Sequence, residues 1–204
     1  MYDERYTEYQ RRRSRLRRLV RRVYLARAAR LCRGRVLDFG CGIGALLERL
    51  PAGSMGLEVN AASVAYCRAR GLNVALYDPD TDGYSLRDLP IGQFDTLIAS
   101  HVLEHLERPD EALPLLFGAC RRLGITRVVV IVPGPKGFAS DSTHRTFVDE
   151  AYLRERHLLD VAGWRRVGLR RFPLDSVWFG RLFTHNELSL VWEMMEGLRD
   201  PAGQ

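Results

Sequence analysis

The sequence has few of the residues that mark secreted, metal-clustered or membrane-spanning proteins. Of its four cysteines the closest two, Cys32 and Cys41, are nine residues apart, so no pair has the spacing of a zinc site and no disulfide framework is indicated. The longest uninterrupted aliphatic run, Val128 to Val132, is far too short to cross a bilayer, and no apolar signal segment is found. We therefore expect a cytoplasmic protein without a transmembrane segment.

Internal repeats and low-complexity tracts are also absent, and lysine occurs only once, at Lys136. The apolar content of 46% and the charged content of 27% are ordinary for a globular protein, so disorder throughout the chain is not indicated. With 204 residues the chain is long enough for one α/β domain and too short for a comfortable second one. We expect a helical segment at residues 1–33 and the domain itself at residues 34–204.

The positive charge is concentrated near the N-terminus. Residues 1–35 hold thirteen arginines against three acidic residues, although the net charge of the whole chain is only +6, so the remainder is acidic. Between Tyr9 and Leu31 there is no proline or glycine, and apolar residues recur at steps of three and four, at Leu16, Leu19, Val20, Val23 and Tyr24. This pattern predicts a basic amphipathic helix whose apolar stripe packs on the domain. Contact of its arginines with RNA or an anionic membrane is the alternative.

The clearest motif is a short apolar run that ends in an acid and three alternating glycines, Val36-Leu37-Asp38-Phe39-Gly40-Cys41-Gly42-Ile43-Gly44. It predicts a strand, a tight loop and the start of a helix over Ala45 to Leu50. Glycine has no Cβ, so such a loop can adopt positive φ and let a ligand approach the bare backbone. In the dinucleotide-binding fingerprint the third glycine comes one residue later, so we do not expect a pyrophosphate here.

Asp38, Gly40, Gly42 and Gly44 resemble the first motif of the class I S-adenosylmethionine (SAM) methyltransferases, whose loop wraps the amino-acid end of the cofactor. Glu58 ends the next expected strand, Met55 to Val59, twenty residues beyond Asp38, which is the distance at which an acid meets ribose hydroxyls in a βαβ unit. The resemblance implies that the cofactor is SAM and that these residues bind it.

The rest of the chain alternates between strand and helix patterns, which favours a parallel sheet with right-handed crossovers. We expect a Rossmann-like α/β three-layer sandwich with a mostly parallel seven-stranded sheet and a reversed last strand. A helix over residues 186–198 is the competing interpretation of the last segment. The expected elements are helix Ala61 to Arg70, strand Leu72 to Tyr77, strand Gln93 to Ser100, helix Asp110 to Arg122, strand Arg127 to Val132, helix Val148 to Ala162, strand Arg165 to Phe172 and strand Glu187 to Glu193.

Two further acidic and polar positions follow expected strands. Asp78 closes the third strand, and the resemblance implies that an acid there holds the adenine amino group. The segment from Phe94 to Pro109 resembles the fourth-strand segment of the same family, which implies that Ser100 and His101 lie at the cofactor, with His101 beside the transferred methyl.

The segment from His101 to His105 also fits two metal motifs. His-x-x-Glu-His spells the inverted zinc-protease motif, but that motif belongs on a helix and not at a strand exit. Some quinone-pathway O-methyltransferases of the resembled class hold a divalent ion with a Glu-x-x-Glu-His segment at this place, whereas this chain has His101 in the leading position. We predict no metal.

The resemblance implies methyl transfer from SAM. We expect O-methylation of a small molecule, such as a glycan or lipid-linked intermediate, with His101 and His144 as candidate catalytic residues because a histidine near neutral pKa can take a hydroxyl proton. Ser100 is followed by His-Val-Leu instead of the Pro-Pro-aromatic sequence of base-amine methyltransferases, which weighs against exocyclic base amines as the acceptor. An RNA methyltransferase that uses the arginines, or a non-catalytic SAM-binding protein, are the alternatives. The oligomeric state is not encoded.

Overall fold

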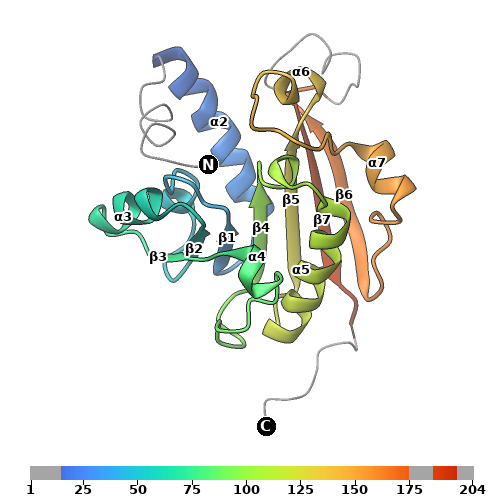
Figure 1. Cartoon of the computed structure of the whole chain (residues 1–204), viewed down its shortest axis with the longest axis horizontal. Helices are drawn as coiled ribbons and strands as arrows, with labels where there is room; N and C mark the ends of the chain where they lie inside the picture. The colour runs from blue at the N-terminus through green and yellow to red at the C-terminus, as the bar shows by residue number, and fades with distance from the viewer. Residues whose placement is uncertain (1–14, 175–185, 197–204) are drawn as a thin grey trace.

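The computed structural model of the chain describes residues 15–174 and 186–196 (Figure 1). Seven strands form one sheet in the order β3-β2-β1-β4-β5-β7-β6. Strand β7 pairs antiparallel with both β5 and β6, and the other neighbouring strands pair in parallel. The mostly parallel sheet with a reversed last strand is therefore confirmed. The strands are β1 (Val36–Phe39), β2 (Met55–Glu58), β3 (Val74–Leu76), β4 (Thr96–Ser100), β5 (Arg127–Pro133), β6 (Trp164–Phe172) and β7 (Glu187–Met194).

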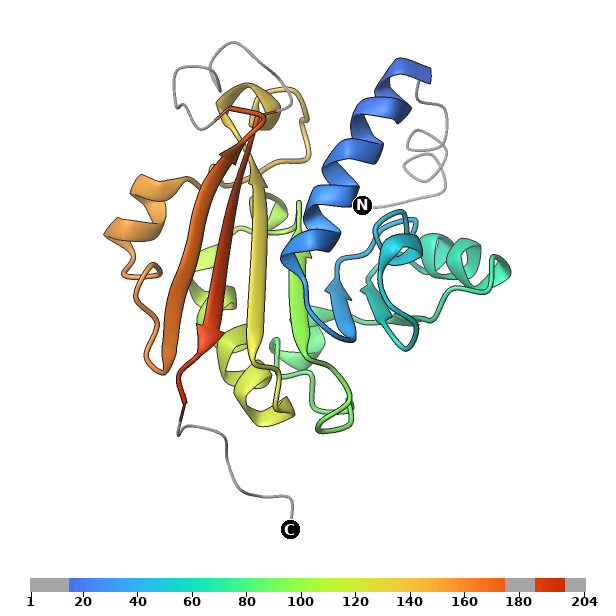
Figure 2. The ribbon, with the colours of Figure 1, turned by 180° about the vertical axis from the view of Figure 1, so that it is seen from behind.

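Helices cover both faces of this sheet, which gives three layers (Figures 1 and 2). Strand β5 shows why, because its side chains alternate between the faces. Val129 and Ile131 join a buried cluster with Ala28 of helix α2, whereas Val128 and Val130 join the main core under helix α5. The helices and turns are α2 (Arg15–Leu31), η1 (Leu47–Arg49), α3 (Ala61–Ala69), α4 (Pro79–Asp82), η2 (Leu103–His105), α5 (Pro109–Leu123), α6 (Pro135–Phe138) and α7 (Glu150–Glu155). None of the described helices is long and apolar enough to cross a membrane.

Two expected helices are shorter than predicted, and a third helix that was considered as an alternative is absent. Residues 45–50 form only the single 3-10 turn η1, which ends before Pro51. The helix expected over residues 148–162 is reduced to α7, because Asp149 caps its start and His157 adopts a left-handed backbone with φ of 55° that ends it. Residues 187–194 form strand β7, so the helix considered for residues 186–198 is wrong.

Helix α2 packs on the domain through its C-terminal half. Ala28 is only 4% exposed and contacts the cluster formed by β1, β4 and β5, with Leu25 and Leu31 packed beside it. The predicted stripe is wrong at Val23, which is 52% exposed, while the side chains of Leu16, Leu19 and Val20 lie outside the described residues. The buried face of the helix is thus centred on Ala28.

Ala28→Glu should destabilise the protein by about 2 to 4 kcal/mol, because a carboxylate would be buried in the cluster under α2. Urea unfolding followed by circular dichroism measures this. Val23→Glu is the matched control on the same helix, and it should change stability by less than about 0.5 kcal/mol because Val23 is exposed. Equal stability of the two variants would mean that α2 does not pack on the sheet in solution.

Candidate active site

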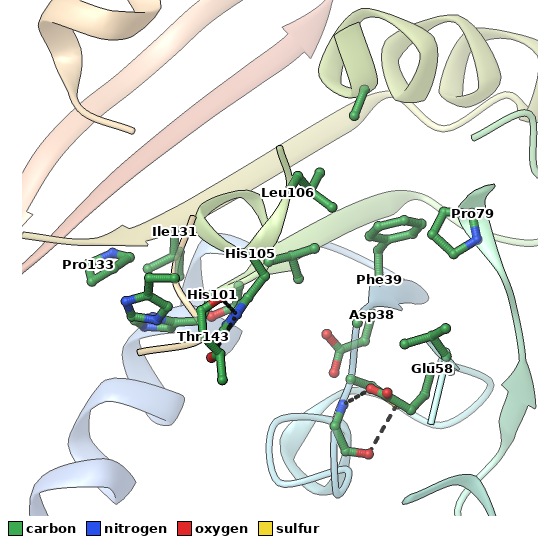
Figure 3. A pocket seen from close by; sticks show the side chains of 18 of the residues that line it. Asp38, Phe39, Glu58, Pro79, His101, His105, Leu106, Ile131, Pro133 and Thr143 are labelled. Carbon is green, nitrogen blue, oxygen red and sulfur yellow. Dashed lines mark hydrogen bonds between the residues drawn. The ribbon is translucent and has the colours of Figure 1, made fainter. Parts of the chain in front are cut away.

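An open cleft of about 1420 Å³ lies at the carboxyl ends of the parallel strands. Strands β1, β2 and β4 end there, and helix α2 and the segment of residues 137–145 contribute further walls. Asp38 and Glu58 lie on one side of the cleft, and His101, His105 and Thr143 lie on the other (Figure 3). Ligands of open α/β sheets bind at this edge because loops and helix termini converge there.

The glycine loop that follows β1 forms the floor of the cleft. Gly40 and Gly42 line it, and both have positive φ, 73° and 55°. A Cβ on Gly40 would lie 2.6 Å from Val102 Cγ2, so only glycine fits there without displacing a neighbour. Gly44 does not line the cleft. A Cβ on Gly44 would meet Leu72 Cδ1 at 2.5 Å, so this third glycine is required by packing.

Glu58 connects this loop to the end of β2. Its Oε2 accepts from the main-chain N–H of Gly42 at 2.7 Å, and its Oε1 accepts from that of Asn60 at 2.9 Å. Burial raises the pKa of Glu58, and these main-chain hydrogen bonds oppose the rise. A carboxylate can accept about four hydrogen bonds, so Glu58 can still accept from a ligand in the cleft.

Asp38 is the least satisfied group of the cleft. It is 2% exposed, and its Oδ2 has no hydrogen-bond partner among the described residues. Burial raises the pKa of its carboxyl to about 7, and the charge of Glu58 adds to the rise. A ligand with a cationic or hydrogen-bond-donating group at this position would remove the cost of the unpaired oxygen.

Asp78 and Asp80 both follow β3, and they have different surroundings. Asp78 is exposed and caps helix α4, because its carboxylate accepts from the N–H of Asp80 at 3.0 Å and from the hydroxyl of Thr81 at 2.8 Å. Asp80 lines the cleft, and Asp78 does not. Asp78, which the resemblance assigned to the adenine amino group, is therefore used to cap helix α4.

His101 lies at the end of β4, next to Ser100, and both residues line the cleft. Its backbone φ is 58°, and its imidazole lies between two carboxylates, with Nδ1 3.0 Å from Glu104 and Nε2 2.8 Å from Glu187. Partial burial lowers the pKa of His101, but the two carboxylates offset this and raise it to about 10. His101 is therefore protonated at neutral pH and has no lone pair with which to accept a proton.

His144 lies beside His105 on the same side of the cleft, with ring centroids 4.8 Å apart. Nδ1 of His144 lies 2.8 Å from the carbonyl oxygen of Phe138, which can only accept, so Nδ1 is the donor of this hydrogen bond and Nε2 takes no part in it. Burial lowers the pKa of His105, and the charge of His144 lowers it further, whereas that of Glu104 opposes the shift.

Sequence reasoning missed several groups of this site. Glu187 reaches His101 from 86 residues away, and no local pattern signals that contact. Ala28 of α2 lines the cleft although the expected apolar stripe ended at Tyr24, which also lines it. The acid and the two histidines of the segment from His101 to His105 were visible in the motif, but the place of Glu104 depends on main-chain hydrogen bonds from Arg145 and Thr146. The sequence also predicts that residues 172–185 form a wall of the substrate pocket, and residues 175–185 of this segment lie outside the described residues.

Sequence comparison finds a family and a relative. The profile of the family described as methionine biosynthesis protein MetW matches residues 24–134, which is more than half of the chain. An uncharacterized protein of Synechococcus sp., syc1184_c, is 31% identical over 113 residues, which cover 51% of this chain and 27% of that protein. The chain thus matches about a quarter of the length of this curated relative.

Structure comparison finds class I methyltransferases. A SAM-dependent methyltransferase from Archaeoglobus fulgidus is 24% identical, with a TM-score of 0.64 over 94% of this chain and 100% of that chain. The N-methyltransferase NodS from Bradyrhizobium japonicum, solved with S-adenosyl-L-homocysteine, is 16% identical, with a TM-score of 0.62 over 86% of this chain and 87% of that chain. At these identities the likeness establishes the fold, so the expected methyltransferase fold is confirmed.

Because the pKa of Asp38 is raised, we expect the free energy of unfolding to depend on pH. A carboxyl whose folded-state pKa is raised contributes stability that is fully present below its unfolded value near 3.8 and is lost as the pH rises through about 7. Between pH 5 and pH 8 the wild type should therefore lose stability relative to Asp38→Asn, on the order of 1 to 3 kcal/mol. Urea unfolding at the two pH values measures the difference.

Asp160→Asn is the matched control, because Asp160 is exposed and lies away from the cleft. Its pH profile should run parallel to that of the wild type. If the Asp38→Asn profile also ran parallel to the wild type, the Asp38 carboxyl would not be the strained group that its burial indicates.

Proposed function

This chain belongs to the family of the methionine biosynthesis protein MetW, and from that premise and the cleft we propose that it transfers a methyl group from SAM to the hydroxyl of a small molecule. The observation that carries the proposal is the buried oxygen of Asp38, which has no hydrogen-bond partner among the described residues and lies beside the loop of Gly40 and Gly42. SAM carries an ammonium group, which complements the carboxylate of Asp38. It also carries ribose hydroxyls, which can donate to the second acid, Glu58.

The residues on this side of the cleft fit SAM in chemistry. We assign Asp38 to the amino group, Glu58 to the ribose, and the backbone of Gly40 and Gly42 to the amino-acid end, with Gly44 supporting the loop by packing. Ser100 and His101 also line the cleft, and we assign them to the reacting end. At the adenine end Asp80 is better placed than the predicted Asp78, whose carboxylate caps α4. When bound, SAM supplies a methyl on a sulfonium, which passes to the acceptor oxygen as the sulfur–carbon bond breaks.

The chain itself has to orient the acceptor and receive or release its proton. His101 does not serve as the proton acceptor, because the two carboxylates raise its pKa to about 10 and hold it as an imidazolium. It instead holds Glu104 and Glu187 at the end of β4. In His144 the hydrogen bond to Phe138 uses Nδ1 and leaves Nε2 for the acceptor. We assign activation of the acceptor hydroxyl to His144.

The walls of the cleft support a small acceptor. Tyr24 and Ala28 of α2 close one side, and Thr143 and His144 lie on another, so the reacting region is bordered by side chains from distant parts of the chain. The RNA alternative depends on the arginines of residues 1–35, of which Arg5, Arg11, Arg12 and Arg13 lie outside the described residues. It is therefore treated as an outcome of the experiment below.

Glu58→Gln should weaken SAM binding by about 1 to 3 kcal/mol, because an amide can replace only one of the two carboxylate acceptors and removes the charge. Isothermal titration calorimetry measures the affinity. NAD should not compete, since the loop lacks the dinucleotide spacing.

Glu155→Gln, an exposed substitution on α7, should bind SAM as the wild type does. Circular dichroism of both variants separates a loss of binding from a loss of folding. Unchanged SAM affinity in folded Glu58→Gln would remove this acid from the cofactor site.

Incubation with methyl-labelled SAM and a fractionated lysate tests the activity. Label should enter the small-molecule fraction, and His144→Ala should reduce its transfer by roughly 10² to 10⁴-fold with unchanged SAM affinity, as expected for loss of a group that acts on the acceptor proton. His157→Asn is the matched control, because His157 is exposed and has a left-handed backbone that asparagine tolerates.

The distribution of label distinguishes the alternatives. Label in the RNA fraction would favour the RNA methyltransferase, and SAM binding without transfer to any fraction would favour a non-catalytic role. Full activity of His144→Ala would exclude His144 from activation of the acceptor.

A further inference from the structure

Glu104, His105 and His144 bring together one carboxylate and two imidazoles. One ligand atom from each residue lies within 4.8 Å of the other two. Two of these residues come from turn η2 and the third from the loop before α7. The two segments are joined by the main chain, because the carbonyl oxygen of Glu104 accepts from the N–H of Arg145 at 2.7 Å and from that of Thr146 at 3.2 Å. The cluster is therefore built on hydrogen-bonded backbone.

The carboxylate of Glu104 is incompletely satisfied. Its side chain is fully buried, its Oε1 lies 3.0 Å from Nδ1 of His101, and its Oε2 has no hydrogen-bond partner among the described residues. A buried carboxylate oxygen without a partner costs free energy, and such oxygens are rare unless a ligand or water satisfies them. The oxygen therefore indicates a ligand that the protein binds between these side chains.

Both imidazoles are oriented by their Nδ1 atoms. Nδ1 of His144 donates to Phe138, as described above. Nδ1 of His105 lies 3.2 Å from the hydroxyl oxygen of Thr143 and 3.4 Å from its carbonyl oxygen. The hydroxyl hydrogen of Thr143 is already donated to Asp141, at 2.7 Å, so the imidazole is the donor. Metal-binding histidines are commonly held by such a hydrogen bond from the second ring nitrogen, which leaves Nε2 as the ligand.

We propose that Glu104, His105 and His144 bind a divalent cation of the zinc class. Two imidazoles and one carboxylate, with a remaining position open to the cleft, form a donor set that suits Zn²⁺ and Co²⁺. The ion requires bonds of about 2.0 to 2.2 Å, and one ligand atom of each residue lies within 4.8 Å of the other two, so the three side chains can share one ion. The predicted absence of a metal is thus revised by the buried oxygen of Glu104 and the third ligand from the distant loop.

The use of this ion rests on the proposed function, whereas its binding does not. A cation at this place lowers the pKa of an acceptor hydroxyl that reaches the open position, so the hydroxyl proton leaves to water and the oxygen attacks the methyl carbon as the sulfur–carbon bond breaks. His144 then acts on the acceptor through the ion. The expected acceptor is an oxygen-bearing molecule able to bind a cation.

Titration of the tag-free, chelator-stripped full chain with Co²⁺ tests the site, because bound Co²⁺ gives a visible absorption spectrum that depends on its ligands. One Co²⁺ should bind per chain, and Zn²⁺ should displace it. His144→Ala and Glu104→Gln should weaken binding by at least tenfold, and His157→Asn should bind as the wild type does. Circular dichroism checks folding, and His144→Ala keeps the test valid if Glu104→Gln fails to fold.

A stoichiometry far below one, or equal Co²⁺ affinity of the wild type and folded His144→Ala, would overturn the site. SAM binding to the same preparations separates the two proposals. SAM binding without Co²⁺ binding would overturn only the metal site, and Co²⁺ binding without SAM binding would overturn only the proposed methyl transfer.

Discussion

The hydrogen bond from the N–H of Gly42 to Glu58 determines the shape of the cleft, because it joins the loop after β1 to the end of β2. The same carboxylate accepts from the N–H of Asn60, and the side chain of Asn60 in turn caps helix α3 through the N–H of Ala62. One buried acid thus fixes the path of the glycine loop and the start of the next helix. The loop can follow this path only because Gly40 and Gly42 tolerate positive φ.

The side of the cleft that holds Asp38 and Glu58 could be predicted from the sequence because its groups are close in the chain. Asp38, Gly40 and Gly42 lie within five residues, and the parallel pairing of β1 with β2 brings Glu58 to the same edge. The choice between Asp78 and Asp80 could not be predicted, since both follow the same strand. It depends on the cap of α4, which uses Asp78.

The other side of the cleft depends on contacts between distant segments, which a local pattern does not encode. His101 meets Glu187 because β7 is inserted antiparallel between β5 and β6, and this pairing determines the protonation state of the imidazole. Helix lengths were mispredicted for a related reason. At His157 the backbone turns left-handed so that Leu158 and Leu159 reach the core, and burial of these side chains overrides the helical pattern.

The inner surface of the cleft carries more negative than positive charge, although the protein is basic overall. At the rim, Arg108 pairs with Glu111 and Arg145 pairs with Glu107. These rim arginines are therefore already compensated and do not neutralise the acids inside.

Deeper in the cleft the imidazolium of His101 is shared by Glu104 and Glu187, so this trio has a net negative charge at neutral pH. Across the cleft, Asp38 and Glu58 have no ion-pair partner among the described residues, and burial raises the pKa of both. Both sides thus hold carboxylates at an electrostatic cost that a cationic ligand would reduce. SAM carries a positive sulfonium and a positive ammonium group, which suit the side of Asp38 and Glu58. A divalent cation suits the side of Glu104. The negative charge of the cleft therefore supports both proposals.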